Sequence, residues 1–93
     1  MARFCKPRGI ALDRQGNLWV ADTGNHMLRR IDAAGNVTTV AGTPGVCGSR
    51  DGSGGQAQFC DPQDVGIDNW GNVYVVDTGN STIRMVNDKG IVS

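Results

Sequence analysis

The chain has 93 residues, with nine basic and nine acidic side chains and no net charge at pH 7. This length suffices for one small domain, and the balanced charge argues against a strong electrostatic attraction to nucleic acid or to an anionic membrane. No apolar run approaches the roughly 18 to 20 residues that span a bilayer. We therefore expect neither a nucleic-acid partner nor a membrane partner.

Fourteen glycines separate short apolar runs, which is typical of a turn-rich, all-β chain. Within residues 1–41, alternating or β-branched runs predict four strands joined by tight hairpins, at about 9–13, 18–22, 27–32 and 37–41. Gly16 can adopt the positive φ that the first short turn requires. The run Leu18–Asp22 is apolar on both faces, so we expect both faces to be covered.

The same pattern occurs a second time, 55 residues further along the chain. Leu18-Trp-Val-Ala-Asp-Thr-Gly-Asn25 returns as Val73-Tyr-Val-Val-Asp-Thr-Gly-Asn80, and no gap is needed to align the copies. The second unit, residues 62–93, has three comparable strands and a shortened outermost strand. The connector, residues 42–61, contains six glycines and few strand-forming residues. It either carries a function or merely leads from the outer strand of one unit to the inner strand of the next.

Four-stranded repeats joined by such a connector are typical of β-propeller blades. The repeat resembles the NHL family, whose Asn-His-Leu signature appears in Gly24-Asn-His-Met-Leu-Arg-Arg-Ile31 with Met27 inserted. The second copy departs from it, reading Gly79-Asn-Ser-Thr-Ile-Arg-Met-Val86. Further similar segments are Pro7-Arg-Gly-Ile-Ala-Leu-Asp13, Gly16-Asn-Leu-Trp-Val-Ala-Asp22 and Asp51-Gly-Ser-Gly. We therefore expect an all-β chain with two NHL-type blades, residues 1–41 and 62–93.

The resemblance implies six blades around a channel, so a chain with two blades looks like a fragment or an engineered piece. Burying one large aliphatic side chain stabilises a fold by roughly 1.5–3 kcal/mol. Two blades whose outer faces remain in contact with water would lose much of this stabilisation. They would also expose apolar patches that monomers seldom carry. We expect copies to associate head to tail into a closed ring. A trimer, with six blades, is favoured over a dimer or a tetramer.

Three cysteines stand at positions 5, 47 and 60. Cys5 and Cys60 are repeat equivalents, and the partner of Cys5 would precede the first residue, so parity favours a Cys47–Cys60 disulfide. This bond would stabilise the fold by roughly 3 kcal/mol in the chain-entropy model. The sequence shows no targeting segment and leaves the compartment open, and the disulfide, if it forms, is compatible with an extracytoplasmic origin. The alternatives are a Cys5–Cys47 bond between neighbouring copies and three buried thiols.

The remaining polar residues do not form a recognisable catalytic group. His26 is the only histidine, and the cysteine spacing is poor for zinc, so we expect no metal and no cofactor. Four acids recur at equivalent turn positions of the two units, and we interpret them as turn-bonding groups: Asp13, Asp22, Asp68 and Asp77. Two arginines, Arg29 and Arg84, also recur, and we interpret them as partners of the next blade. No hydrolase, metalloprotease or phosphate-binding motif is present. We therefore predict that the chain is not an enzyme.

Loops carry binding sites more often than strands do. The candidates for a ligand-facing rim are accordingly Asn25, His26, Arg50, Asp51 and Asn80. The leading hypothesis is a non-enzymatic, self-assembling propeller fragment that serves as a binding or structural scaffold. One alternative is a piece of a propeller enzyme, of lyase or hydrolase type, whose catalytic residues lie in other blades. Another is an RNA-binding NHL module, which the balanced charge disfavours.

Overall fold

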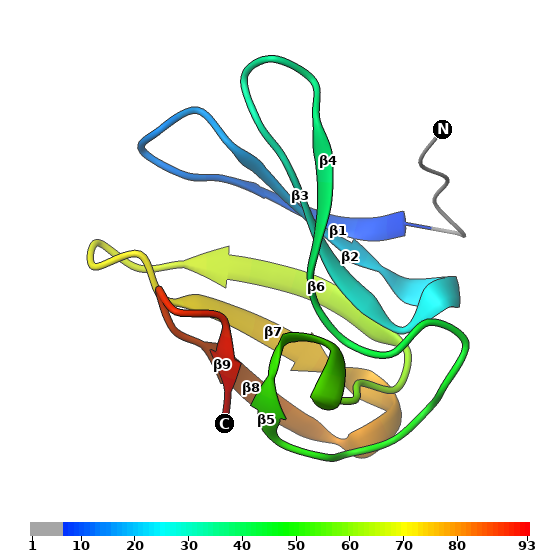
Figure 1. Ribbon diagram of the computed structural model, residues 1–93. Helices are drawn as coiled ribbons and strands as arrows, with labels where there is room; N and C mark the ends of the chain where they lie inside the picture. Colours follow the sequence, from blue (N-terminus) through cyan, green and yellow to red (C-terminus); the bar gives the residue numbers. More distant parts are fainter. Residues whose placement is uncertain (1–6) are drawn as a thin grey trace.

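The computed structural model describes residues 7–93, which form two antiparallel sheets that lie side by side (Figure 1). The first sheet has the order β1-β2-β3-β4 and comprises β1 (Pro7–Leu12), β2 (Leu18–Asp22), β3 (Met27–Ile31) and β4 (Val37–Ala41). The second has the order β5-β9-β8-β7-β6 and comprises β5 (Gly52–Ser53), β6 (Pro62–Ile67), β7 (Val73–Asp77), β8 (Thr82–Val86) and β9 (Ile91–Val92). The all-β class and the up-and-down order of a propeller blade are as predicted.

Among residues 7–93, single-turn 3-10 helices occur at three places: η1 (Thr23–Asn25), η2 (Gly54–Gln56) and η3 (Thr78–Asn80). Because η1 and η3 occupy equivalent turns, His26 and Ser81 both follow them in the left-handed conformation, with φ of 59° and 56°. No helix within residues 7–93 has the length and apolar character needed to cross a membrane.

The innermost hairpin of each blade turns around one aspartate. Oδ1 of Asp13 accepts hydrogen bonds from the backbone amides of Gln15 and Asn17, both at 2.9 Å, while Gly16 adopts φ +86°. Asp68 organises the equivalent turn of the second blade in the same way. Both acids are therefore turn-bonding groups, as the sequence indicated.

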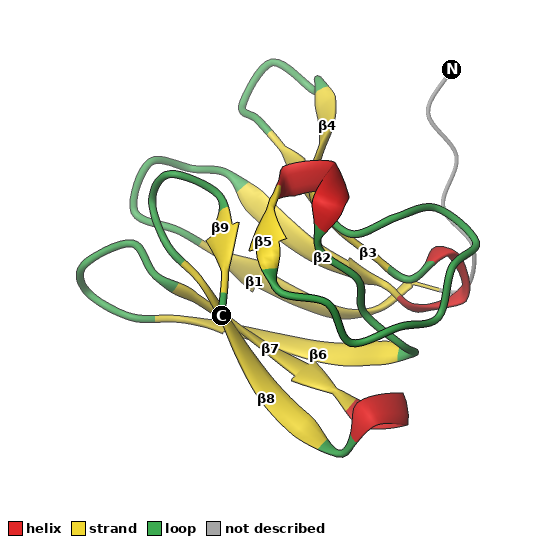
Figure 2. Ribbon diagram, turned by 60° about the horizontal axis from the view of Figure 1, so that its bottom comes forward, coloured by secondary structure: helices red, strands yellow, loops and turns green. Residues whose placement is uncertain are grey.

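The connector differs from the expectation of a segment without strands. Gly52 and Ser53 pair with Val92 and Ile91, so β5 becomes the outermost strand of the second sheet. The outer edge of β9 presents backbone groups that need partners, and the connector supplies them. Figure 2 shows η2 directly after β5, and the Gly42 amide donates to the carbonyl of Gly54 there at 3.2 Å.

The two blades share one core. Its largest fully buried side chains are Leu28, Phe59, Val73, Val75, Val86 and Val92. At the contact between blades, a Cβ added to Gly9 would clash with Cα of Asp64 and lie 2.9 Å from the carbonyl oxygen of Gln63. The hydroxyl of Thr23 donates to the carbonyl of Pro62 across the same contact at 2.6 Å. Glycine thus permits the close backbone approach of the inner strands β1 and β6.

The outward faces of both blades remain apolar. Ile10 and Leu12 on the first blade are 62% and 67% exposed, and Ile83 on the second is 70% exposed. The repeat equivalents of Ile10 and Leu12 are Val65, which is buried, and Ile67, which packs against the core. Each outward face therefore has the same residue pattern as a face that is buried in the contact between the two blades.

Candidate functional site

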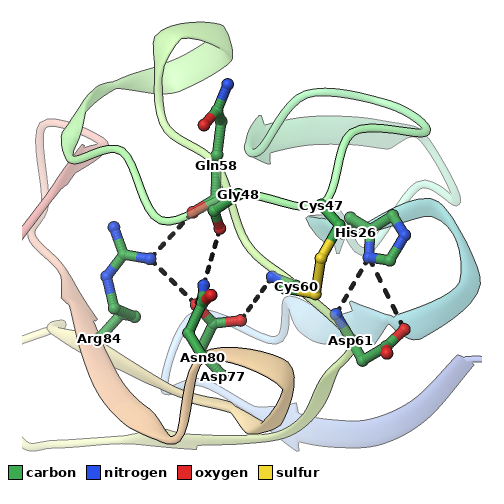
Figure 3. The surroundings of a disulfide bond; sticks show 9 residues. All are labelled: His26, Cys47, Gly48, Gln58, Cys60, Asp61, Asp77, Asn80 and Arg84. Carbon is green, nitrogen blue, oxygen red and sulfur yellow. Dashed lines mark hydrogen bonds and ion pairs between the residues drawn. A yellow bond between two sulfur atoms is a disulfide. The ribbon is translucent and has the colours of Figure 1, made fainter.

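A buried acid–arginine pair, Asp77 and Arg84, lies on the second blade beside the rim candidate Asn80 (Figure 3). Oδ2 of Asp77 accepts hydrogen bonds from Nη1 of Arg84 at 3.0 Å and from Nδ2 of Asn80 at 2.7 Å. Oδ1 of Asp77 accepts from the backbone amide of Cys60 at 2.7 Å. Because the Asp77 side chain has no exposed surface and the Arg84 side chain is 7% exposed, this pair is shielded from water.

The guanidinium of Arg84 also binds the connector. Its Nη1 donates to the carbonyl of Gln58 at 2.9 Å, and its Nη2 donates to the carbonyl of Arg50 at 3.0 Å and to the Asp51 carboxylate at 2.6 Å. The guanidinium lies 5.4 Å from the ring centroid of Phe59. The expectation that this arginine binds the next blade is wrong: its partners are an acid of its own blade and the connector that leads into that blade.

The first blade carries the equivalent pair. Arg29 Nη1 lies 3.4 Å from Oδ2 of Asp22, and Asn25 Nδ2 donates to the same oxygen at 2.9 Å. Both Asp22 and Arg29 are buried. The Asp-x-x-Asn-x-x-x-Arg spacing therefore builds the same local brace in both blades.

The predicted disulfide between Cys47 and Cys60 is present. Cys5, which was considered as a partner of Cys47, lies outside the described residues. The disulfide closes a loop within the connector, and the amide of Gly79 donates to the Cys60 carbonyl at 2.8 Å, so this hydrogen bond ties the loop to the turn of η3. The adjacent amide of Asp61 donates to Nδ1 of His26 at 3.0 Å. His26 thus accepts a hydrogen bond with Nδ1 and joins the turn of the first blade to the connector.

Arg50 and Asp51 belong to the connector, and the other three rim candidates contact it, so most of the five make internal contacts. Asn25 and Asn80 bind the buried acids, and Asn80 also donates to the Gly48 carbonyl at 2.7 Å. His26 binds the connector amide, and Asp51 binds Arg84. Arg50 contributes its carbonyl while its side chain is exposed. Together with the buried acid–arginine pairs, these contacts hold the connector in place, and we call this set of contacts the brace.

A groove of about 500 Å³ lies between the blades on the side of the hairpin tips. Trp19, Arg30 and Trp70 line it, together with Asn87 and Asp88. The Arg30 guanidinium stacks over the Trp19 ring at 5.7 Å, and Trp70 is 81% exposed. Sequence reasoning missed this groove because Trp19 and Trp70 are not repeat equivalents, and only the packing of the blades brings them together.

Asp13 holds the edge of this groove in place. Trp19 Nε1 donates to Oδ2 of Asp13 at 2.9 Å, beside the side-chain amide of Asn17 at 3.0 Å. Burial raises the pKa of Asp13, but the hydrogen bonds from Trp19, Asn17 and Gln15 outweigh it and hold the pKa below its ordinary value. Asp13 is therefore an ionised anchor for the Trp19 ring. Within residues 7–93, no three His, Cys, Asp or Glu side chains are grouped so as to hold a metal ion.

Comparison with known proteins places these features in a family. The model of the NHL repeat matches residues 4–31 and 59–84. The chain is 35% identical over 81 residues to the chloroplastic protein SUPPRESSOR OF QUENCHING 1 of Arabidopsis thaliana, covering 86% of this chain and 8% of that protein. It is 33% identical to the probable peptidyl-alpha-hydroxyglycine alpha-amidating lyase pgal-1 of Caenorhabditis elegans, covering 94% of this chain and 24% of that protein.

Solved structures agree with the fold. A protein of unknown function from Bacteroides thetaiotaomicron superposes with a TM-score of 0.86 at 32% identity, over 90% of this chain and 22% of that one. Virginiamycin B lyase from Staphylococcus aureus superposes with a TM-score of 0.70 at 19% identity, over 94% of this chain and 25% of that one. The chain thus spans a quarter or less of these relatives. With two matched repeats, each folded as a propeller blade, the chain belongs to the NHL repeat family.

Proposed function

We propose that the chain is a non-enzymatic propeller segment that assembles with itself and serves as a binding or structural scaffold. Copies pack head to tail through their outward blade faces until a ring closes. The observation that carries this proposal is the equivalence between the outward faces and the surfaces packed at the centre of the molecule.

The residues on the outward face of the first blade are the repeat equivalents of the residues by which the second blade contacts the first. Ile10 occupies the position of Val65, which is 8% exposed in the central contact. The outward face of the second blade repeats the opposite side of that contact: Ile83, 70% exposed, occupies the position of Leu28, which is fully buried. The two outward faces are therefore built to pack on each other rather than on themselves.

Such a contact between copies is heterologous, and a heterologous contact gives a ring when its rotation closes. Three copies supply six blades, the number that the family resemblance implies. The connector joins blades only within one chain, so the junctions between copies are held by the blade faces alone. Exposed apolar area of this kind marks association surfaces in soluble proteins.

The non-enzymatic assignment is supported by the brace. The buried acid and arginine of each blade bind one another, and Arg84 also binds the connector backbone, which is a structural use of these groups. The alternative, a segment of a propeller lyase, is favoured by the relative named as an amidating lyase, of which the chain covers 24%. Incubation with a peptidyl-α-hydroxyglycine separates the two: we expect no release of the amidated peptide, and release would support the alternative.

A complementation experiment tests the head-to-tail contact. Ile10→Asp blocks the first outward face, and Ile83→Asp blocks the second. Neither variant alone can close a ring. When mixed, the intact second face of the Ile10→Asp chain packs on the intact first face of the Ile83→Asp chain, so sizing with light scattering should show a dimer. The exposed Val46→Asp in the connector is the matched control and should assemble like the unmodified chain. Failure of the mixture to form a dimer would contradict the proposed contact.

A further inference from the structure

Two segments match the acceptor pattern for N-linked glycosylation, Asn-x-Ser/Thr. One is Asn36-Val37-Thr38, at the start of β4, and the other is Asn80-Ser81-Thr82, between η3 and β8. A pattern this short is only a hypothesis until its surroundings are known. Here the surroundings of the two asparagines differ sharply.

Asn36 is exposed at the tip of the β3–β4 hairpin, and Thr38 is exposed as well. The hairpin is held by Asp32, whose Oδ1 accepts from the backbone amide of Asn36 at 2.9 Å. Nδ2 of Asn36 donates to Oδ2 of Asp32 at 3.1 Å. A side-chain amide has two hydrogens, so this contact uses one and leaves the other for a glycosidic bond. The folded hairpin therefore accommodates a glycan on Asn36.

Asn80 lies in the opposite situation. Its Nδ2 donates to the carbonyl of Gly48 and to the buried carboxylate of Asp77, each at 2.7 Å. Both amide hydrogens are thus used, and a sugar on Nδ2 would break one of the contacts that hold the connector. Figure 3 shows the side chain of Asn80 between Asp77 and Gly48 of the connector, with its amide directed at both. Glycosylation of Asn80 and the native brace are mutually exclusive.

The disulfide supplies an independent argument about the compartment. Structural disulfides persist in oxidising environments, which include the lumen of the endoplasmic reticulum, where N-linked glycans are attached. The Cys47–Cys60 bond supports the brace around Asn80 and indicates that the chain folds under such conditions.

From these observations we infer that Asn36 is an N-glycosylation site and that Asn80 is not. In the transfer, the Asn36 amide nitrogen forms a bond to the anomeric carbon of a lipid-pyrophosphate-linked oligosaccharide. The bond from that carbon to the pyrophosphate oxygen breaks, the amide loses one proton to a base of the transferase, and the lipid pyrophosphate leaves. No electrons are exchanged with another group.

The position of Asn36 gives the glycan a physical role. β4 is the outer edge strand of the first sheet, opposite β1, and its sequence Val-Thr-Thr-Val-Ala carries no charge and no proline. Such an edge is open to pairing with other chains. In the second sheet the connector strand β5 covers the equivalent edge. A glycan on Asn36 would shield the edge of β4 and leave the outward blade faces free.

The test is secretion of the full chain from a eukaryotic cell line, with a cleavable signal sequence, followed by treatment with peptide-N-glycosidase. Thr38→Val removes the first acceptor pattern but keeps Asn36 and its bond to Asp32. Thr38→Ser keeps the pattern. Thr82→Val removes the second pattern without altering Asn80. The readouts are gel mobility and mass mapping of the asparagine that the enzyme converts to aspartate.

We expect one glycan, at Asn36, in the unmodified chain and in the Thr38→Ser and Thr82→Val variants, and none in Thr38→Val. A secreted chain without a glycan would overturn the assignment of Asn36. A glycan at Asn80 in secreted, disulfide-bonded protein would overturn the exclusion of that residue. Because circular dichroism is recorded on each secreted variant, loss of glycan is distinguished from loss of fold.

Discussion

Arg84 and Asp77 form a buried ion pair, with Nη1 3.0 Å from Oδ2, at the point where the connector crosses the second blade. The same guanidinium binds two connector carbonyls, so one side chain fixes both the blade and the segment that leads into it. The hydrogen bonds of Arg84 therefore hold the glycine-rich connector in place.

Replacing Arg84 by Met should destabilise the fold strongly. The change leaves the Asp77 carboxylate buried without its cation and frees the carbonyls of Gln58 and Arg50. Breaking a buried pair by removing one partner costs about 3–5 kcal/mol. Urea unfolding followed by circular dichroism measures this, and Arg14→Met, at an exposed turn position, is the control that should change little. Similar midpoints for both variants would contradict the role given to Arg84.

The disulfide should contribute measurably to stability. Replacing Cys47 and Cys60 together by serine opens the connector loop and should lower the free energy of unfolding by about 3 kcal/mol. A reductant should lower the stability of the unmodified chain to a similar extent. The double variant should not respond to reductant, and a response there would mean that another bond carries the effect.

Gly9 should not tolerate a side chain. A Cβ at this position would collide with the backbone of Asp64 in the neighbouring blade. Overpacking of this kind costs about 1–3 kcal/mol, so thermal unfolding of Gly9→Ala should occur at a clearly lower temperature. Gly66→Ala is the matched control because no heavy atom lies within 4 Å of its added Cβ. Equal stability of the two variants would show that the blades do not approach as described.

Acid should weaken the hairpins in a predictable direction. Burial raises the pKa of Asp13, but the hydrogen bonds that it accepts outweigh this effect and hold the pKa in the folded chain below its ordinary value. The stability that this group contributes is therefore fully present above the unfolded value of about 3.9 and is lost as pH falls through the folded pKa. Urea midpoints from about pH 6 to about pH 2 should show this loss. Asp13→Asn should show a shallower acid dependence, and an unchanged slope would contradict the assignment.

Much of the fold could be predicted from the sequence because it occurs twice. Two copies of Asp-Thr-Gly-Asn at one spacing fix the strand order and the turns, and the position of Cys5 relative to Cys60 indicated the correct disulfide. β1 begins at Pro7 and not at residue 9, since Pro7 pairs with Asp22 beyond an irregularity in register that the alternating pattern does not reveal.

The brace and the groove could not be predicted in the same way. Arg84 binds carbonyls of Arg50 and Gln58, and backbone acceptors leave no signature in residue type. β5 forms because Gly52 and Ser53 find a free edge of β9, a contact set by tertiary packing rather than by strand propensity. The groove depends on Trp19 and Trp70 from different repeat positions, so comparing the repeats gives no hint of it.

The native mass in solution tests the central claim most directly. Light scattering on a sizing column should give three times the chain mass of 9.8 kDa, because three copies bring six blades together and cover every outward face. A mass of one chain, unchanged over a range of protein concentrations, would mean that the faces around Ile10 and Ile83 remain in contact with water. That result would contradict head-to-tail assembly.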